Sequence, residues 1–144
     1  MIHKLLYLFV FFFSGFVLSQ GDWVITNLAP LTEPTAYNAV CEATINNEKR
    51  VYSFGGTTDI IDSSSVHRRV FYYSVELNQW DTLEHVPDYI GKLGMRASFV
   101  NNRIYIVGGH AFDTINNEKI VSQSMHVFNP FLDTFEVDAA NIPT

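Results

Sequence analysis

The sequence predicts an all-β protein built from repeated four-stranded antiparallel sheets. Two short apolar strands each run directly into a pair of glycines, residues 51–54 into Gly55-Gly56 and residues 104–107 into Gly108-Gly109. The pairs lie 53 residues apart (55 to 108), and each is followed by a strand with an aromatic residue and then a proline. A period of about fifty residues is typical of a β-propeller blade rather than of a helical array.

The first 19 residues are predicted to be a secretory signal peptide. Lys4 gives a positive leader, and residues 5–18 are apolar apart from Ser14 and Gly15. This run is too short to span a bilayer comfortably, and no second apolar run follows it. We therefore expect the mature protein to be secreted, periplasmic or at the cell surface, with no stable membrane insertion after cleavage. An uncleaved N-terminal anchor is the alternative.

The first predicted sheet has strands at 38–45, 50–54, 69–75 and 79–83. Asn46 and Asn47 separate the first two strands, and asparagine tolerates the positive φ that a tight hairpin needs. Asn78 lies before the fourth strand, in a second predicted hairpin. These strands are rich in β-branched and aromatic residues and are bounded by turn residues, as expected for a meander.

The second predicted sheet repeats this order, with strands at 95–100, 103–107, 123–128 and 134–137. Asn101-Asn102 occupies the place of Asn46-Asn47, and residues 129–134 supply the second hairpin. The strand at 104–107 is apolar throughout, so both of its faces need cover. Sheets stacked as neighbouring blades supply that cover, with a large aromatic such as Trp80 filling the space between them.

These units resemble kelch repeats. The residues that carry the resemblance are the glycine pairs, the aromatics Tyr73 and Phe128, Trp80 and Phe135 in the tryptophan position, and the closing prolines. Two departures are that Phe135 replaces the usual tryptophan and that the strand-one arginine, Arg96, aligns with Cys41 in the first unit. The resemblance implies a kelch-type β-propeller fragment.

Two blades do not close a ring, because propellers have four to eight. Residues 20–37, with Trp23 seven positions before Pro30, are expected to form one extra N-terminal strand of a ring-closing blade and a linker. Blade 1 is then 38–90 and blade 2 is 91–144. Further blades of a longer chain, or self-association, are expected to complete the ring.

Composition excludes some partners and chemistries. Cleavage removes Lys4 and leaves 8 basic (9 − 1) against 15 acidic residues, a formal net charge of −7, which argues against a nucleic-acid partner. The single cysteine, Cys41, excludes an intrachain disulfide and is expected to be a buried structural residue. No cofactor and no metal site are predicted.

Polar residues of the long loops are the candidates for ligand contact. The loops at 57–68, 84–94 and 110–122 emerge on one face, here called the loop face, and long loops on a rigid scaffold commonly carry function. The candidates in these loops are Asp59, His67, His110 and Asp113. Arg96, in a predicted first strand near the expected central channel, is the fifth candidate, and it is as well suited to hydrogen-bond neighbouring backbone as to meet a ligand. The spacing of the candidates predicts neither a metal site nor a catalytic triad. The alternative to a role in ligand contact is that these residues are solvated loop residues that cap turns.

The sequence therefore favours an exported binding scaffold that recognises a protein or a glycan through its loop face. The kelch resemblance leaves a second interpretation open, because some members resemble sialic-acid mutarotases and others galactose oxidases with copper. Under that interpretation the chain is a sugar-active enzyme whose active site is incomplete here. No catalytic residue is transferable by motif.

Overall fold

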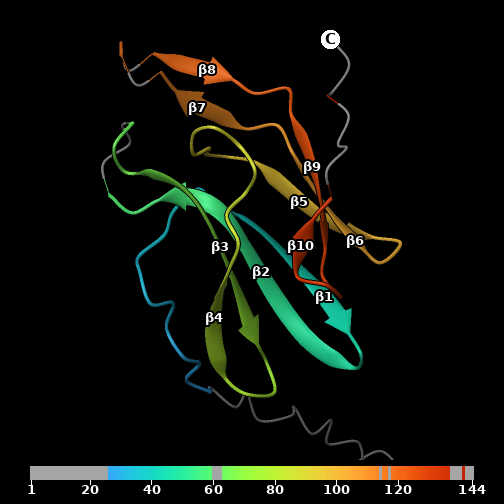
Figure 1. The fold of residues 1–144 in the computed structure, drawn as a ribbon. Helices are drawn as coiled ribbons and strands as arrows, with labels where there is room; N and C mark the ends of the chain where they lie inside the picture. The colour runs from blue at the N-terminus through green and yellow to red at the C-terminus, as the bar shows by residue number, and fades with distance from the viewer. Residues whose placement is uncertain (1–25, 60–62, 114, 117, 137–140, 142–144) are drawn as a thin grey trace, which may run out of the picture.

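The computed structural model describes residues 26–59, 63–113, 115–116, 118–136 and 141, and within them the chain is all-β. Figure 1 shows two four-stranded sheets lying against one another, with a small hairpin at one end. In this part of the chain no helix has the length and apolarity needed to cross a membrane. The predicted signal peptide lies outside the described residues.

The first sheet has the order β1-β2-β3-β4, formed by β1 (Ala39–Ile45), β2 (Glu48–Thr57), β3 (Val66–Ser74) and β4 (Gln79–Leu83). All neighbours are antiparallel. The hairpin residues Asn46 and Asn47 have φ values of 51° and 69°, and Asn78 has 52°. The predicted meander and its turn residues are confirmed, although β2 and β3 extend further towards the loop face than predicted.

The second sheet has the order β10-β9-β6-β5 and repeats the same meander. Its strands are β5 (Arg96–Val100), β6 (Arg103–Val107), β9 (Met125–Asn129) and β10 (Thr134–Phe135). Asn101 and Asn102 again have positive φ, at 47° and 63°. The second predicted blade is therefore confirmed in order and pairing.

An additional hairpin interrupts the loop between β6 and β9. It consists of β7 (His110–Phe112) and β8 (Lys119–Val121), paired antiparallel. The sequence predicts only a loop here, because the strands are three residues long and β8 is wholly exposed. The hairpin extends the loop face away from the sheets (Figure 1).

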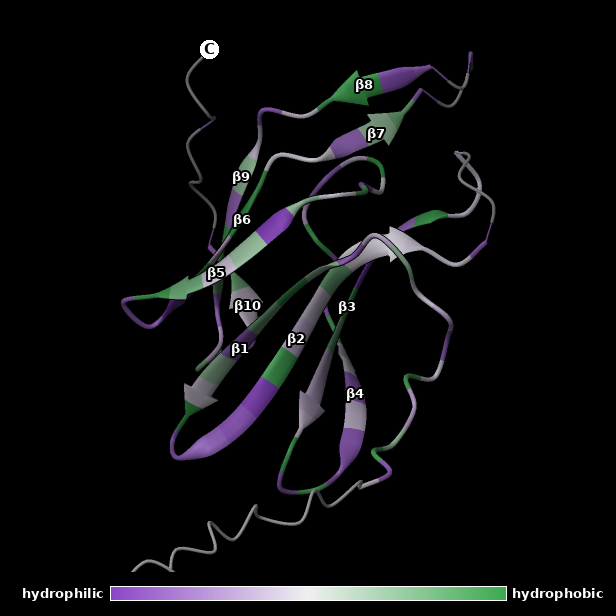
Figure 2. Cartoon of the chain, turned by 180° about the vertical axis from the view of Figure 1, so that it is seen from behind, coloured by the Kyte–Doolittle hydropathy of each residue, from purple (hydrophilic) through white to green (hydrophobic). Residues whose placement is uncertain are grey.

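The core lies between the two sheets. Ring contacts cross the interface from Tyr52 and Phe54 of β2 to Phe128 of β9, with centroids 5.6 Å and 5.7 Å apart. Figure 2 shows β2 changing from hydrophilic near its hairpin with β1 to hydrophobic further along, where this core begins. The buried residues of the cluster are Ala39, Ala43, Ile45, Tyr52, Phe54, Val70, Val86, Met95, Ile104, Ile106 and Phe128.

The sheets approach each other most closely at their first strands, because β1 and β5 lie side by side. Stacked sheets of this kind are wedged, with the first strands innermost and the fourth strands at the rim. The start of β1 and the start of β5 therefore mark the inner end of the loop face, here called the channel mouth.

The glycine pairs allow another part of the backbone to approach closely. Gly55 and Gly56 lie inside β2, at an irregularity in its register with β3, rather than beyond the strand end. The Gly56 N–H donates to the Lys92 carbonyl at 3.1 Å. Gly108 and Gly109 lie between β6 and β7, and both have positive φ.

The structure corrects the alignment of the two units at their first strands. Ala39 pairs with Phe54, the residue before the first glycine pair, and Arg96 pairs with Val107, the residue before the second. Arg96 therefore corresponds to Ala39, not to Cys41. The shift arises because the β1–β2 hairpin is longer than the β5–β6 hairpin, so counting from the asparagine turns gives a different register.

The segment before β1 runs along the side of the first sheet that faces away from β9. The Trp80 indole donates to the Ala29 carbonyl at 3.0 Å, and Ala29 N–H donates to the Asn78 side chain at 2.8 Å. Arg69 forms an ion pair with Glu33 at 2.6 Å. Between residues 26 and 37 the regular pairing is a single bridge, Ala36 with Thr57, and the earlier part of the expected N-terminal strand lies outside the described residues.

Candidate functional site

Two of the predicted site residues have local structural partners. Asp113 accepts hydrogen bonds from the Ile115 N–H at 2.8 Å and from the Asn116 side chain at 3.3 Å, so it caps the turn between β7 and β8. Asp59 is exposed just beyond β2, and its carbonyl accepts from the Thr57 hydroxyl at 3.2 Å. Within the described residues, neither carboxylate forms a hydrogen bond or an ion pair with another of the candidates.

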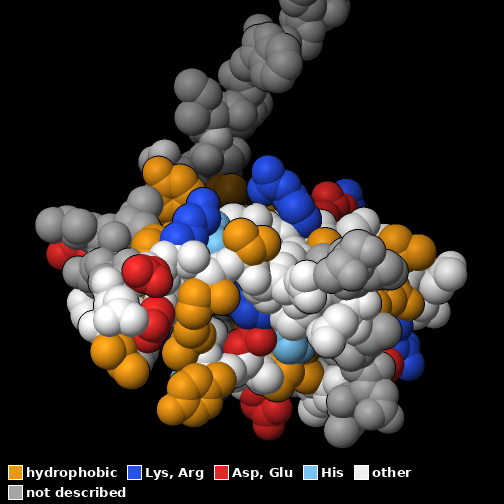
Figure 3. All heavy atoms as spheres, turned by 90° about the horizontal axis from the view of Figure 1, so that it is seen from above, with side chains coloured by type: hydrophobic (Ala, Val, Ile, Leu, Met, Phe, Trp, Pro, Cys, Tyr) orange, Lys and Arg blue, Asp and Glu red, His pale blue; other side chains and the backbone are white. Residues whose placement is uncertain are grey.

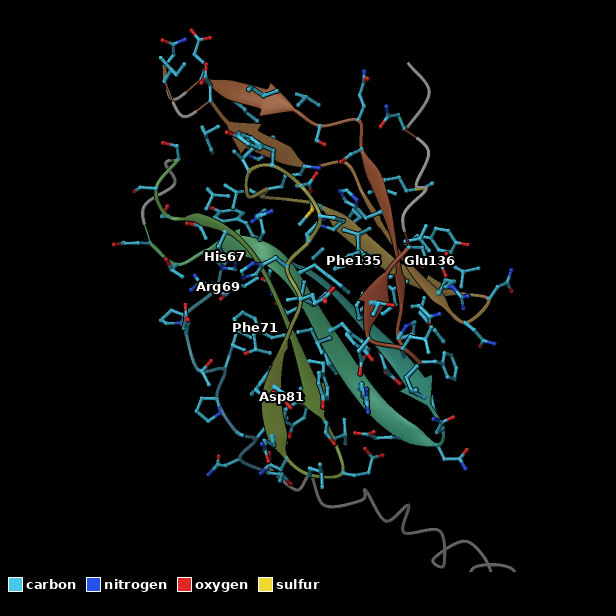
Figure 4. The ribbon with its side chains drawn as sticks, viewed as in Figure 1. His67, Arg69, Phe71, Asp81, Phe135 and Glu136 are labelled. Carbon is cyan, nitrogen blue, oxygen red and sulfur yellow. The ribbon has the colours of Figure 1, made fainter. Side chains whose placement is uncertain are left out.

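His67 is a half-buried histidine on β3, on the same side of the strand as Arg69 and Phe71 (Figure 4). Its Nδ1 accepts from the Arg69 N–H at 3.2 Å, which places the proton of the neutral ring on Nε2. That Nε2 is buried with no partner among the described residues. Burial, followed by the Arg69 charge, lowers the pKa of His67 to about 4.

We expect His67 to make the protein less stable as the pH falls from about 6.5 to about 4. In this window the unfolded histidine is protonated and the folded one is not, so folding releases a proton and acid opposes it. Allowing for the partial exposure of the ring, the free energy of unfolding should drop by about 1–2 kcal/mol between pH 7 and pH 5.

The measurement is urea unfolding of the parent chain and of His67→Gln at both pH values. The variant should lose most of this pH dependence, because glutamine does not titrate. An unchanged slope in His67→Gln would assign the acid sensitivity to other groups.

The channel mouth gathers Tyr37, Gly94, Arg96 and His110. The Gly94 N–H donates to the Tyr37 carbonyl at 2.9 Å, so the residues that precede β1 and β5 are directly joined. A Cβ added at Gly94 would lie 3.9 Å from two atoms of the His110 ring. Arg96 is the first residue of β5 and is exposed. Two of the predicted candidates, Arg96 and His110, therefore lie around the same glycine.

Tyr37 is the residue at this mouth that the sequence analysis missed. Its φ is 57°, a left-handed conformation that is uncommon for a residue with a bulky side chain, and Gly94 takes the corresponding place in the second unit with a φ of 65°. Hydrogen bonds of 3.0 Å and 2.9 Å between Ala36 and Thr57 fix the backbone beside it. The Tyr37 side chain remains 59% exposed.

The backbone and the ring of His110 are both held in place by contacts with other residues. Its N–H and carbonyl exchange hydrogen bonds with Leu93 at 2.9 Å and 2.8 Å, and its ring meets Phe112 edge-on at 5.7 Å. Burial and, secondarily, the Lys119 charge lower the pKa of His110 below its ordinary value. At neutral pH the ring is uncharged, with one nitrogen able to donate and one able to accept.

A second polar cluster lies between the blades and is here called the Asp88 cluster: Asp88, Lys92, Ser124 and His126. Asp88 Oδ1 lies 2.7 Å from Lys92 Nζ and 3.0 Å from His126 Nε2, and Lys92 also donates to the Ser124 hydroxyl. Burial acts to raise the pKa of Asp88, but the hydrogen bonds from His126 and Lys92 outweigh it and hold the pKa below its usual value.

The Asp88 cluster is not a nucleophilic triad. A triad needs the acid on one ring nitrogen of the histidine and the hydroxyl on the other. Here Asp88 and the Ser124 hydroxyl, at 3.4 Å, both meet His126 Nε2. Ser124 therefore has no separate base, and the cluster joins the connection between the blades to the start of β9.

Cys41 is a structural residue. It lies on β1 and packs against the core, and burial raises the pKa of its thiol to about 12. A thiol with such a pKa stays protonated at neutral pH and is a poor nucleophile. Among the described residues, no group of three or more His, Cys, Asp or Glu side chains is placed to hold a metal ion.

Charged groups and histidines are interspersed with hydrophobic ones on the face shown in Figure 3, and no single sign of charge dominates it. This face includes the end of the molecule at which β7 and β8 lie in Figure 1. A mixed surface of this kind suits recognition by hydrogen bonds and rings more than by charge alone.

Comparison with known proteins establishes the architecture. No family model matches the chain, and no curated protein matches it. The solved structure of YjhT is similar to it, with a TM-score of 0.63 and 18% sequence identity over 83% of this chain and 36% of that one. This chain thus spans about a third of the length of that structure. The likeness shows the fold alone: two neighbouring blades of a β-propeller.

Proposed function

We propose that this chain belongs to an exported binding protein that recognises a glycan or a protein at its loop face, with the channel mouth as the contact site. The observation that carries the proposal is Tyr37. A left-handed backbone costs a non-glycine residue about 1–2 kcal/mol, and the second unit uses glycine at the equivalent place. Strain of this kind clusters at functional sites.

The groups around Tyr37 suit such a contact. An exposed tyrosine offers a rigid ring and a hydroxyl, and tyrosine and arginine are among the residues most enriched at binding hot spots. Arg96 adds an exposed guanidinium, and His110 adds an uncharged imidazole. Together they supply a stacking surface, donors and an acceptor within one small area.

The test is Tyr37→Gly in the full chain. We expect the thermal midpoint to stay the same or to rise, because glycine adopts positive φ without strain. Binding to a panel of immobilised glycans should fall at least tenfold for every glycan that the parent chain binds, since each loses the tyrosine ring.

Phe131→Ala is the matched control, because Phe131 is 42% exposed and lies in the β9–β10 turn at the opposite end of the blade. It should leave glycan binding unchanged. Equal binding by the parent chain and Tyr37→Gly would contradict the assignment of the site, and a parent chain that binds no glycan would contradict glycan recognition.

A sugar isomerase of the mutarotase type is the second candidate. The uncharged His110 ring is suited to passing a proton between sugar oxygens, and Arg96 is suited to pairing with the carboxylate of an acidic sugar. Anomer exchange of N-acetylneuraminic acid, followed by NMR with and without the protein, tests this. Exchange that is accelerated by the parent chain and lost in His110→Gln supports it, and an unchanged exchange rate rejects it for this chain.

A further inference from the structure

A separate pocket lies between the rims of the two blades and plays no part in the proposed channel-mouth site. It has a volume of about 430 Å³, within the usual range for small-ligand sites. Here called the rim pocket, it combines the connection after β4 with the start of β9 and the end of β10. Its lining residues are Glu84, His85, Pro87, Ser124, Met125, His126, Phe135 and Glu136.

One wall of the rim pocket is made of packed rings. Phe135 meets His126 at 6.4 Å with an interplanar angle of 86°, and it packs against Phe128 at 5.0 Å. Met125 and Pro87 add further apolar surface. Figure 4 shows Phe135 and Glu136 side by side in the chain at the end of β10. This wall can cover the methylene stem of a ligand without rearranging.

The polar wall is fixed in advance by the Asp88 cluster. His126 is bound to Asp88 at 3.0 Å, and Ser124 receives a hydrogen bond from Lys92, whose side chain is only 6% exposed. The Lys92 charge is already paired with Asp88. The cluster therefore orders the pocket wall without presenting a free positive charge to a ligand.

The remaining charges of the rim pocket are negative. Glu84 and Glu136 are both exposed, and among the described lining residues there is no lysine or arginine. Arg103 forms an exposed ion pair with Glu136, a kind of pair that a competing cation displaces at little cost. A cation that enters the pocket thus meets two carboxylates, whereas an anion meets no counter-charge in the lining.

We propose that the rim pocket binds a small organic cation, the guanidinium or ammonium group at the end of a short alkyl stem. The stem lies against Phe135 and Met125, and the charged head lies between Glu84 and Glu136. Arginine or lysine side chains of a peptide present this chemistry. The proposal stands on the rim pocket alone, so it is independent of glycan recognition at the channel mouth.

The test is an NMR titration of the full chain with n-butylguanidinium and with its uncharged isostere, n-butylurea. The cation should shift the amide resonances of Ser124, His126 and Glu136 with a dissociation constant on the order of 1 mM, as expected for so small a ligand. The urea should bind at least fivefold more weakly.

Glu84→Gln and Glu136→Gln should each weaken binding of the cation about three- to tenfold. Glu42→Gln is the matched control, because Glu42 is an exposed carboxylate on β1, outside the pocket lining, and it should bind as the parent does. Equal affinity for the urea, shifts that map outside the pocket, a similar loss in Glu42→Gln, or no binding of the cation would each overturn the proposal.

Discussion

Gly56→Ala and Gly109→Ala are each expected to reduce the free energy of unfolding by about 3 kcal/mol or more, from backbone strain together with a steric overlap. Gly56 has a φ of 114°, and an added Cβ would lie 2.7 Å from the Ala36 carbonyl oxygen. At Gly109 the φ is 84°, and the Cβ would lie 2.7 Å from the Leu93 carbonyl oxygen. Both oxygens belong to backbone that is fixed by hydrogen bonds.

The matched control is Gly94→Ala. Gly94 also has a positive φ, 65°, but the nearest atoms to an added Cβ are 3.9 Å away, in the His110 ring. Alanine at this position should therefore cost only the conformational strain, about 1–2 kcal/mol. Urea unfolding of the three variants separates the two effects. Equal losses at all three positions would show that close backbone approach at the glycine pairs is not what requires glycine.

Phe128→Ala is expected to reduce the free energy of unfolding by about 3–5 kcal/mol. The Phe128 side chain is fully buried, and its ring contacts Tyr52 and Phe54 of the first sheet as well as Phe135 of its own. Removing the ring leaves a cavity between the two sheets, and the hydrogen bonds between strands keep each sheet from closing it. The surrounding rings therefore collapse into it only in part.

Thermal and urea unfolding of Phe128→Ala measure this loss, with Phe131→Ala as the control. Phe131 is three residues further along the chain and 42% exposed, so its removal should cost less than about 1 kcal/mol. A loss of similar size in both variants would contradict an interblade core centred on Phe128.

The sheets were predictable because their signals are local. The asparagine pairs at 46–47 and 101–102 adopt positive φ at both residues, as the two hairpins require. The apolar strand at 104–107 has Ile104 and Ile106 buried against the first sheet. The pairing of strand one with strand two, and of strand three with strand four, followed from the short turns between them. The pairing of strand two with strand three, across a long loop, followed from the repeat of the whole unit.

The regions that differed from prediction depend on contacts between distant parts of the chain. The β7–β8 hairpin has exposed residues and little local signal, and its place is fixed by backbone bonds from His110 to Leu93. The correspondence of Arg96 to Ala39 in the repeat depends on hairpin lengths that two asparagine pairs alone do not reveal. Gly55 and Gly56 remain in β2 because the backbone of residues 36 and 92 bonds to this part of the strand.

The candidate sites were only partly predictable for the same reason. Arg96 and His110 were identified from their places in the repeat, and both lie at the channel mouth. Tyr37 carries no signal in its own neighbourhood, and only its alignment with Gly94 across the repeat would have indicated a left-handed residue. The Asp88 cluster joins Lys92 to Ser124 across 32 residues, a separation for which sequence provides no pairing rule.

The central claim is that the two sheets stack as neighbouring blades through one aromatic core. The most direct measurement is a set of nuclear Overhauser contacts in the full chain, with those between Tyr52 and Tyr72, 6.0 Å apart within the first sheet, as the internal reference. We predict contacts between the ring protons of Tyr52 and Phe128, whose centroids are 5.6 Å apart. Reference contacts without any contact from Tyr52 or Phe54 to Phe128 would show that the sheets form but do not stack, and would contradict the account.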